Sequence, residues 1–340
     1  MNPPQLISSS FGSEFDPSVS PNGRYLAYTS DISGNEDIWI LDLKERERRK
    51  VTANTSSDYA PCFLGNDRLV FVSTRANSGG EIYVSGLKGE NIRRIIGGEG
   101  YFDSPAVSPD RKTIAYIHKK GDENVRIYFF NIKSEATAPG PIGLDPAFAP
   151  SGERIVFAKV GDGLVNPGRL ALYDLQGDSI QNIETGPGVV SNPAFYPDGR
   201  RIILARHTTD SDEDGFVTRN DRPELMIYDL EDTGNVFRFY PGFFFGEPAL
   251  SPKGQIFAVS DDADIYSLSP DGLAPPLSAA LEQIGLCDSL LRHSITQNDT
   301  LIAAAGCLSA YNHYPDTCKN YLLVAADLYG ALAMTDLALQ

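Results

Sequence analysis

The sequence predicts a mainly β protein: a six-bladed β-propeller over residues 1–273, followed by an α-helical segment over residues 274–340. The 31 glycines and 23 prolines make up about a sixth of the 340 residues, which favours many short elements joined by turns. One pattern also recurs six times, in which a proline, a short turn and an apolar run follow one another. The repeats begin at Pro17, Pro61, Pro105, Pro146, Pro193 and Pro248.

Each repeat predicts a sheet of about four short antiparallel strands within roughly 44 residues. Asn22-Gly23, Asp198-Gly199 and Lys253-Gly254 supply the positive-φ residues that tight hairpins need. The runs after these turns are rich in Ile, Val, Phe and Tyr, and a second apolar strand follows in every repeat. One such sheet cannot bury both of its faces, whereas six sheets stacked around an axis can, and this is the propeller arrangement.

The sixth repeat ends after residues 264–272 without an outer strand of its own. Residues 4–9 precede the first repeat much as residues 50–52 precede the second. We therefore expect residues 4–9 to supply the outer strand of the sixth blade, because this pairing closes the ring and removes a free sheet edge.

From Leu273 the β pattern gives way to three expected helices, over roughly residues 277–293, 298–312 and 315–338. These helices could begin a helical repeat resembling the tetratricopeptide kind, and the natural chain would then continue past Gln340.

The four cysteines show no spacing typical of a zinc site. Cys307 and Cys318 could form a disulfide between neighbouring helices in an oxidising compartment. The alternative is that all four cysteines are inert thiols.

The repeats resemble the TolB-type propeller family, which is related to WD-repeat propellers but lacks their Gly-His and Trp-Asp signatures. The resemblance rests on the Ser-Pro-Asp-Gly type of turn, on the apolar strand after it, and on a strand with an Ile-Tyr or Ile-Trp pair before Asp-Leu, as in residues 38–43. It covers residues 11–273, and it implies a propeller fold, a site for peptide partners at the channel mouth and a periplasmic location. Because this family occurs in many unrelated proteins, the resemblance by itself fixes no activity.

The sharpest local motif lies in the fifth repeat, where residues 210–221 read D-x-D-x-D-G with a further carboxylate at position twelve. Calcium takes six to eight oxygen ligands, and carboxylates at this spacing converge on it. We expect a Ca²⁺ ion that stiffens this loop, although an aspartate at position twelve is shorter than the usual glutamate. The alternative is a solvated acidic loop. The expected ligands are Asp210, Asp212, Asp214, Phe216 through its carbonyl, Thr218 and Asp221.

The segments that enter the first strand of each repeat are acidic and aromatic, and in a propeller they surround the mouth of the central channel. Aromatic side chains offer rigid contact area, and carboxylates would select basic or amine-bearing ligands. The alternative is that these residues recur because they hold neighbouring blades together. The expected partner-binding residues are Phe15, Asp16, Asp58, Tyr59, Phe102, Asp103, Phe244, Phe245 and Glu247.

Charge and composition disfavour several classes of function. The net charge of −16 disfavours nucleic acid and anionic membranes, and Asp327 and Asp336 interrupt the most apolar stretch, so no membrane insertion is expected. The four histidines fall in separate parts of the chain and no G-x-S-x-G motif is present, so no catalytic residues are predicted. The sequence thus favours a non-catalytic propeller that binds a protein or peptide partner at the channel mouth or at the helical tail. The alternatives are a metal-dependent propeller hydrolase or lyase, and a regulatory propeller cut from a larger multidomain protein.

The expected location is periplasmic or extracellular, because a calcium loop of low affinity suits the millimolar calcium outside the cytoplasm. The first residues, MNPPQLISSS, do not resemble a secretory signal, which leaves a cytoplasmic location as the alternative.

Overall fold

A computed structural model describes residues 4–8, 12–160, 169–186, 188–213, 217–232, 236–239 and 244–268. The chain divides into two units: the first comprises residues 1–225 and 243–272, and the second residues 226–242 and 273–340. The elements in the described part are all β-strands, β1 to β24, and they form six four-stranded sheets. The helical segment expected over residues 274–340 lies outside the described residues.

The first three sheets follow the chain in order. The first contains β2 (Glu14–Val19), β3 (Tyr25–Ser30), β4 (Asp37–Asp42) and β5 (Glu47–Lys50). The second contains β6 (Asp58–Phe63), β7 (Arg68–Ser73), β8 (Glu81–Gly86) and β9 (Arg93–Ile96). The third contains β10 (Tyr101–Val107), β11 (Thr113–Lys119), β12 (Arg126–Asn131) and β13 (Thr137–Ile142).

The remaining strands make up the last three sheets. The fourth contains β14 (Leu144–Phe148), β15 (Arg154–Lys159), β16 (Arg169–Asp174) and β17 (Ser179–Ile183). The fifth contains β18 (Val189–Phe195), β19 (Arg201–His207), β20 (Glu224–Asp229) and β21 (Val236–Phe239). The sixth contains β22 (Phe245–Leu250), β23 (Ile256–Ser260), β24 (Ile265–Leu268) and β1 (Gln5–Ser8).

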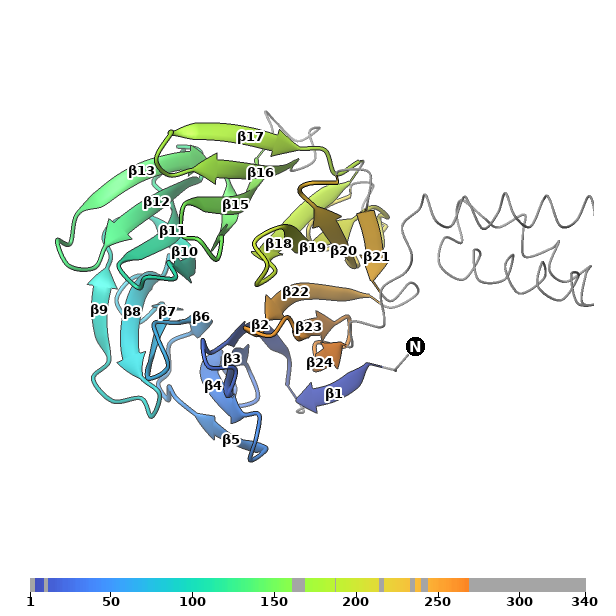
Figure 1. Ribbon diagram of the computed structural model, residues 1–340. Helices are drawn as coiled ribbons and strands as arrows, with labels where there is room; N and C mark the ends of the chain where they lie inside the picture. Colours follow the sequence, from blue (N-terminus) through green and yellow to red (C-terminus); the bar gives the residue numbers. More distant parts are fainter. Residues whose placement is uncertain are drawn as a thin grey trace, which may run out of the picture. The chain divides into compact units, whose positions relative to one another are not determined.

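In the first unit, the innermost strands of the six sheets form a closed ring (Figure 1). Each contacts the next in the order β2, β6, β10, β14, β18 and β22, and β22 contacts β2 again. The fold is therefore a six-bladed β-propeller, as the repeats predict.

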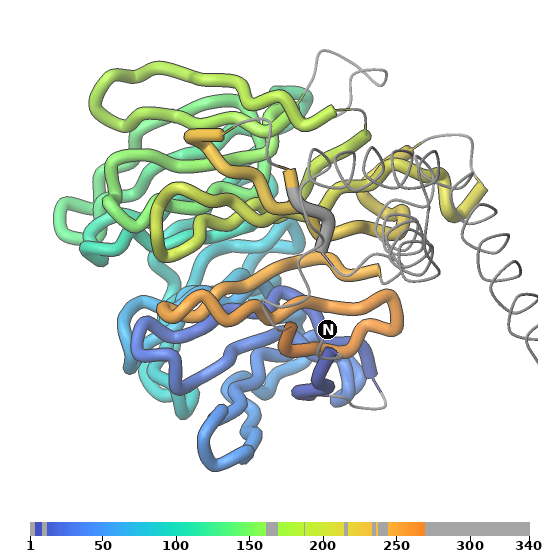
Figure 2. The backbone as a smooth tube through the Cα atoms, turned by 45° about the vertical axis from the view of Figure 1, so that its right-hand side comes forward, coloured from blue at the N-terminus to red at the C-terminus, as the bar shows by residue number. Residues whose placement is uncertain are grey.

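The sixth blade joins the two ends of this ring. Its strand order is β1-β24-β23-β22, and β1 pairs antiparallel with β24, with Gln5 opposite Ser267 and Leu6 opposite Tyr266. Figure 2 shows the N-terminal strand beside the last strands of the first unit. The outermost strand of the last blade thus comes from the start of the chain, so that the edge of β24 is paired.

Apolar side chains fill the spaces between neighbouring blades. Between the first two blades, Ile38 and Ile40 of β4 pack with Phe71 of β7, and all three are at most 1% exposed. Because a blade is covered on both faces, its middle strands are apolar on both faces, and this explains the short continuous apolar runs in the sequence. Full burial of each such side chain stabilises the fold by about 1.5–3 kcal/mol.

All six inner strands are bulged at the same place. The residue before the repeat's proline adopts a left-handed conformation, with φ between 47° and 52° in every blade, and the strand register shifts there. Proline has no N–H to give to the ladder, so the pairing is interrupted where it costs least. The six residues are Asp16, Ala60, Ser104, Asp145, Asn192 and Glu247.

Candidate functional site

A cavity of about 760 Å³ lies at the centre of the first unit, and all six bulged residues line it. The residue after each proline also lines it, and that residue is always small. These small residues are Ser18, Cys62, Ala106, Ala147, Ala194 and Ala249. The small residues after the prolines therefore leave space at the centre of the ring, and most of the bulged residues before the prolines present polar side chains to it.

Three bulged acids connect consecutive blades. The Glu247 carboxylate accepts a hydrogen bond from the backbone N–H of Asp16 at 2.6 Å. The Asp16 carboxylate accepts one from the N–H of Ala60 at 3.1 Å, and the Asp145 carboxylate accepts one from the N–H of Asn192 at 2.9 Å. Since each donor is the bulged residue of the next blade, these acids hold the ring together as well as lining its centre.

The cavity concentrates negative charge. Burial raises the pKa of Glu247, and the nearby charge of Asp16 raises it further. Burial likewise raises the pKa of Asp16, with a contribution from the charge of Asp103, whose own pKa is raised by burial. The cavity therefore favours protons or other cations.

Arg219 extends into this cavity from the connection after β19. Its guanidinium forms an ion pair with Asp145, and burial lowers the pKa of Arg219 to about 10, against the opposing effect of the Asp103 charge. Beside it, the Tyr101 hydroxyl donates a hydrogen bond to the Asp103 carboxylate. Tyr101 remains 40% exposed, so this part of the cavity has an aromatic rim.

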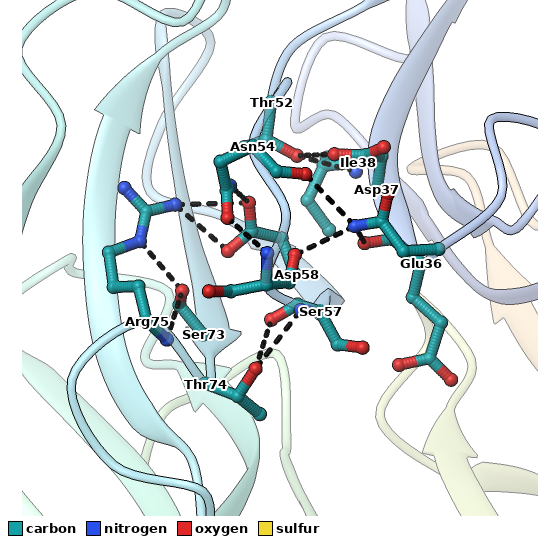
Figure 3. A network of polar contacts seen from close by, with 12 residues as sticks. Glu36, Asp37, Ile38, Thr52, Asn54, Ser57, Asp58, Ser73, Thr74 and Arg75 are labelled. Atoms are coloured by element: carbon teal, nitrogen blue, oxygen red, sulfur yellow. Dashed lines mark hydrogen bonds and ion pairs between the residues drawn. The ribbon is translucent and has the colours of Figure 1, made fainter.

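Four of the nine expected partner-binding residues line the cavity: Asp16, Tyr59, Asp103 and Glu247. Asp58 lies elsewhere. Its side chain is fully buried and accepts two hydrogen bonds from Arg75, at 2.9 and 3.0 Å, and one from Asn54 at 2.5 Å (Figure 3). Arg75 thus neutralises the buried charge of Asp58 within the second blade.

Four of the five expected aromatic residues do not line the cavity. Phe102 is 3% exposed and stacks on His118 at 4.3 Å between ring centroids, and Phe245 is 2% exposed. Phe244 has the Arg222 guanidinium 5.2 Å from its ring centre, and Phe15 is half-buried in β2. None of these four side chains is among the described residues that line the cavity.

Tyr101, Asp145 and Asn192 lie in the segments expected to surround the channel mouth, although they are not among the expected partner-binding residues; Arg219 was not expected there. The position immediately before each proline would have identified Asp145 and Asn192. No repeated position identifies Arg219, because it belongs to a connection found in one blade only.

Three of the six expected calcium ligands lie together. Carboxylate oxygens of Asp210, Asp212 and Asp221 all lie within 4.8 Å of one another, a spread that one ion with Ca–O distances of about 2.3–2.6 Å can span. Asp214 and Phe216 lie outside the described residues. Thr218 contributes its N–H to Asp221, at 2.7 Å.

Asp221 anchors this loop. It is 2% exposed and also accepts a hydrogen bond from the N–H of Ser211 at 2.5 Å. Backbone hydrogen bonds from Thr218 and Ser211 lower the pKa of Asp221 to about 2. The loop therefore has a fixed, ionised carboxylate at the twelfth position of the motif.

One hydroxyl–imidazole pair also lines the cavity. The Ser191 hydroxyl lies 3.0 Å from Nε2 of His207, and Nδ1 of His207 lies 2.6 Å from the backbone carbonyl oxygen of Asp221. Burial lowers the pKa of His207, which favours the neutral ring. His118 lies in β11 near the Glu99 carbonyl, so the two histidines in the described part do not meet.

Within the described residues, no helix has the length and apolar character needed to cross a membrane.

Parts of the chain are similar to known propeller domains and proteins. Residues 3–163 match the TolB beta propeller domain. The chain is 22% identical over 208 residues to the uncharacterized peptidase YuxL of Bacillus subtilis, covering 58% of this chain and 30% of that protein. It is 24% identical over 197 residues to the Tol-Pal system protein TolB of Francisella tularensis, covering 55% and 45%. The chain thus spans less than half the length of these curated relatives.

Solved structures agree on the architecture. A putative TolB from Agrobacterium tumefaciens superposes with a TM-score of 0.61 at 18% identity, covering 78% of this chain and 94% of that one. An oligogalacturonate lyase from Vibrio parahaemolyticus superposes with a TM-score of 0.52 at 11% identity, covering 78% and 94%. At such identities the likeness shows the fold alone. Together with the domain match over residues 3–163, the six bulged repeats and their closed ring show a six-bladed β-propeller that is similar to the TolB type.

Proposed function

We propose that the protein is a non-catalytic binding propeller, which holds a protein or peptide partner at the acidic mouth of its central cavity. The observation that carries this proposal is the cavity itself, lined on one level by small residues and on the next by carboxylates and tyrosines. An extended segment fits a narrow channel of this kind, and its basic groups would meet the carboxylates.

A calcium ion belongs to the same proposal. It would be held by Asp210, Asp212, Asp214, Phe216, Thr218 and Asp221 in the connection that also carries Arg219. The grouping of Asp210, Asp212 and Asp221 supports this part. The ion would neutralise part of the loop's charge and fix its conformation.

The proposal also includes a partner from a protein assembly and a location outside the cytoplasm. Relatives named as Tol-Pal system proteins support a role in a protein assembly. A periplasmic or extracellular location fits such a role and supplies the calcium, and a cytoplasmic location is the alternative. Since the chain spans less than half of its curated relatives, it could also be the regulatory propeller of a larger protein.

Peptide selection tests the proposal. Peptides displayed on phage are selected on the wild-type protein and then tested on two tryptophan variants. Ala147→Trp fills the cavity, whereas Ser179→Trp places the same side chain on an exposed outer strand. Binding should be lost in the first variant and kept in the second. Selection of no peptides, or equal binding to both variants, would contradict the proposal.

The Ser191–His207 contact favours one other candidate, a hydrolase. A neutral imidazole beside a hydroxyl is the arrangement that activates a serine nucleophile. A fluorophosphonate probe should label the wild type and not Ser191→Ala if the pair is active. Under the binding proposal neither protein is labelled.

A further inference from the structure

Among the described residues that line the cavity, Arg219 is the one arginine or lysine. His207 also lines the cavity, and its ring is neutral. Six acids line the same cavity: Asp16, Asp103, Asp145, Asp221, Glu247 and Asp261. Arg219 comes from a surface connection and not from an inner strand. The cavity thus retains excess negative charge with Arg219 in place.

The position of the guanidinium is built by residues that do not depend on Arg219. The Asp145 carboxylate is held by the N–H of Asn192 at 2.9 Å. Asp103 is held by the Tyr101 hydroxyl and by the N–H of Ser104, at 2.6 Å for the latter. The third and fourth blades therefore present two oriented carboxylates and an aromatic hydroxyl to any planar cation at this point.

The side chain of Arg219 can leave without unfolding its loop. Thr218 and Asp221 lie on either side of Arg219 in the sequence, and the Thr218 N–H donates a hydrogen bond to the Asp221 carboxylate. The N–H of Asn220 donates a hydrogen bond to the Thr218 hydroxyl at 3.1 Å. The Arg219 side chain itself remains 35% exposed.

We propose that Asp103, Asp145 and Tyr101 form a subsite for the guanidinium group of a partner's arginine side chain, and that Arg219 occupies this subsite as an internal competitor. The inference rests on the proposed function, because it names the group by which a peptide partner enters the cavity. An incoming arginine replaces the ion pair with Asp145 by an equivalent one, and Arg219 moves to solvent. Lysine is a poorer ligand because its ammonium cannot contact both oxygens of a carboxylate in one plane.

Binding of N-acetyl-L-arginine amide, measured by calorimetry, tests the inference. Arg219→Ala should bind this probe at least tenfold more tightly than the wild type, because the competitor is gone. Arg201→Ala is the matched control: it removes an arginine of the same blade that does not line the cavity and whose ion-pair partner, Asp198, does not line it either, so its affinity should equal that of the wild type. The citrulline analogue has the same shape without the charge and should not bind Arg219→Ala.

Adding Asp145→Asn to Arg219→Ala should reduce the affinity at least tenfold, while the amide oxygen still accepts the hydrogen bond from Asn192. Asp103→Asn in the same background serves as the second variant if the first does not fold. Equal affinities of wild type and Arg219→Ala, or binding of the citrulline analogue as tight as that of the arginine probe, would overturn the inference. If Arg219→Ala gains no affinity while selected peptides still bind, only the inference fails. If the arginine probe binds and no peptide is selected, only the proposed function fails.

Discussion

The carboxylate of Glu247 accepts a hydrogen bond from the backbone N–H of Asp16 at 2.6 Å, and this contact joins the sixth blade to the first across the point where the ring closes. Both residues precede a proline, both adopt a positive φ, and both line the cavity. The same side chains thus contribute to ring closure and to the chemistry of the candidate site.

Removing this contact should weaken the fold. Glu247→Ala leaves the Asp16 N–H without its acceptor and should lower the free energy of unfolding by about 1–3 kcal/mol. Glu247→Gln keeps an oxygen acceptor in the same place and serves as the control. Urea denaturation at neutral pH measures both, and an equal loss in the two variants would show that the hydrogen bond to the Asp16 N–H does not account for the stabilisation.

The raised pKa of Glu247 predicts a pH dependence with a definite sign. The Glu247 carboxyl holds its proton more tightly in the folded state than in the unfolded state. Its contribution to the free energy of unfolding is therefore complete below about pH 4 and is lost as the pH rises toward and through neutrality. Glu247→Gln cannot lose a proton, so it should gain stability relative to the wild type as the pH increases from about 4.5. Denaturation curves at several pH values measure this difference, and a constant difference would contradict the assignment.

Calcium should stabilise the protein. A ligand that binds only the folded state adds about 2.7 kcal/mol at a hundred times its Kd, so Tm should be higher in about 1 mM calcium than in EDTA. Asp212→Asn should reduce the increase. Asp122→Asn changes an exposed carboxylate outside the cluster and should leave it intact. Calcium and EDTA curves that coincide for the wild type would exclude the site.

Asp58 should matter for stability and not for binding. Asp58→Asn breaks an ion pair in which the Asp58 side chain is fully buried and the Arg75 side chain is 25% exposed. A loss of roughly 2–4 kcal/mol is expected, toward the lower end of values for buried pairs because Arg75 reaches solvent. Denaturation measures the loss, and binding of selected peptides by the folded fraction should match the wild type. Weaker peptide binding by that fraction would show that Asp58 contributes to the mouth after all.

The sequence could predict the fold in detail because the signal is repeated six times. The prolines, the turns and the apolar runs lie where the structure has bulges, hairpins and middle strands, and the agreement of many weak signals in register outweighs the ambiguity of each one. The expected calcium ligands come from a motif with fixed spacing, and three of the described ones do converge.

The orientation of side chains at the channel mouth was harder to predict, for a physical reason. Asp58 and Asp16 look alike in the sequence, since each lies at or near the start of an inner strand. The bulge before the proline breaks the alternation of the strand, so the cavity-facing position cannot be found by counting in twos. Arg219 reaches the cavity from a single connection, and such a long-range contact leaves no local pattern.

Titration calorimetry of one selected peptide shows whether a peptide enters the acidic cavity. We expect one peptide bound per chain, an affinity at least tenfold weaker for Ala147→Trp, and an unchanged affinity for Ser179→Trp. Equal affinity in all three proteins would place the peptide outside the cavity and rule out the proposed binding site.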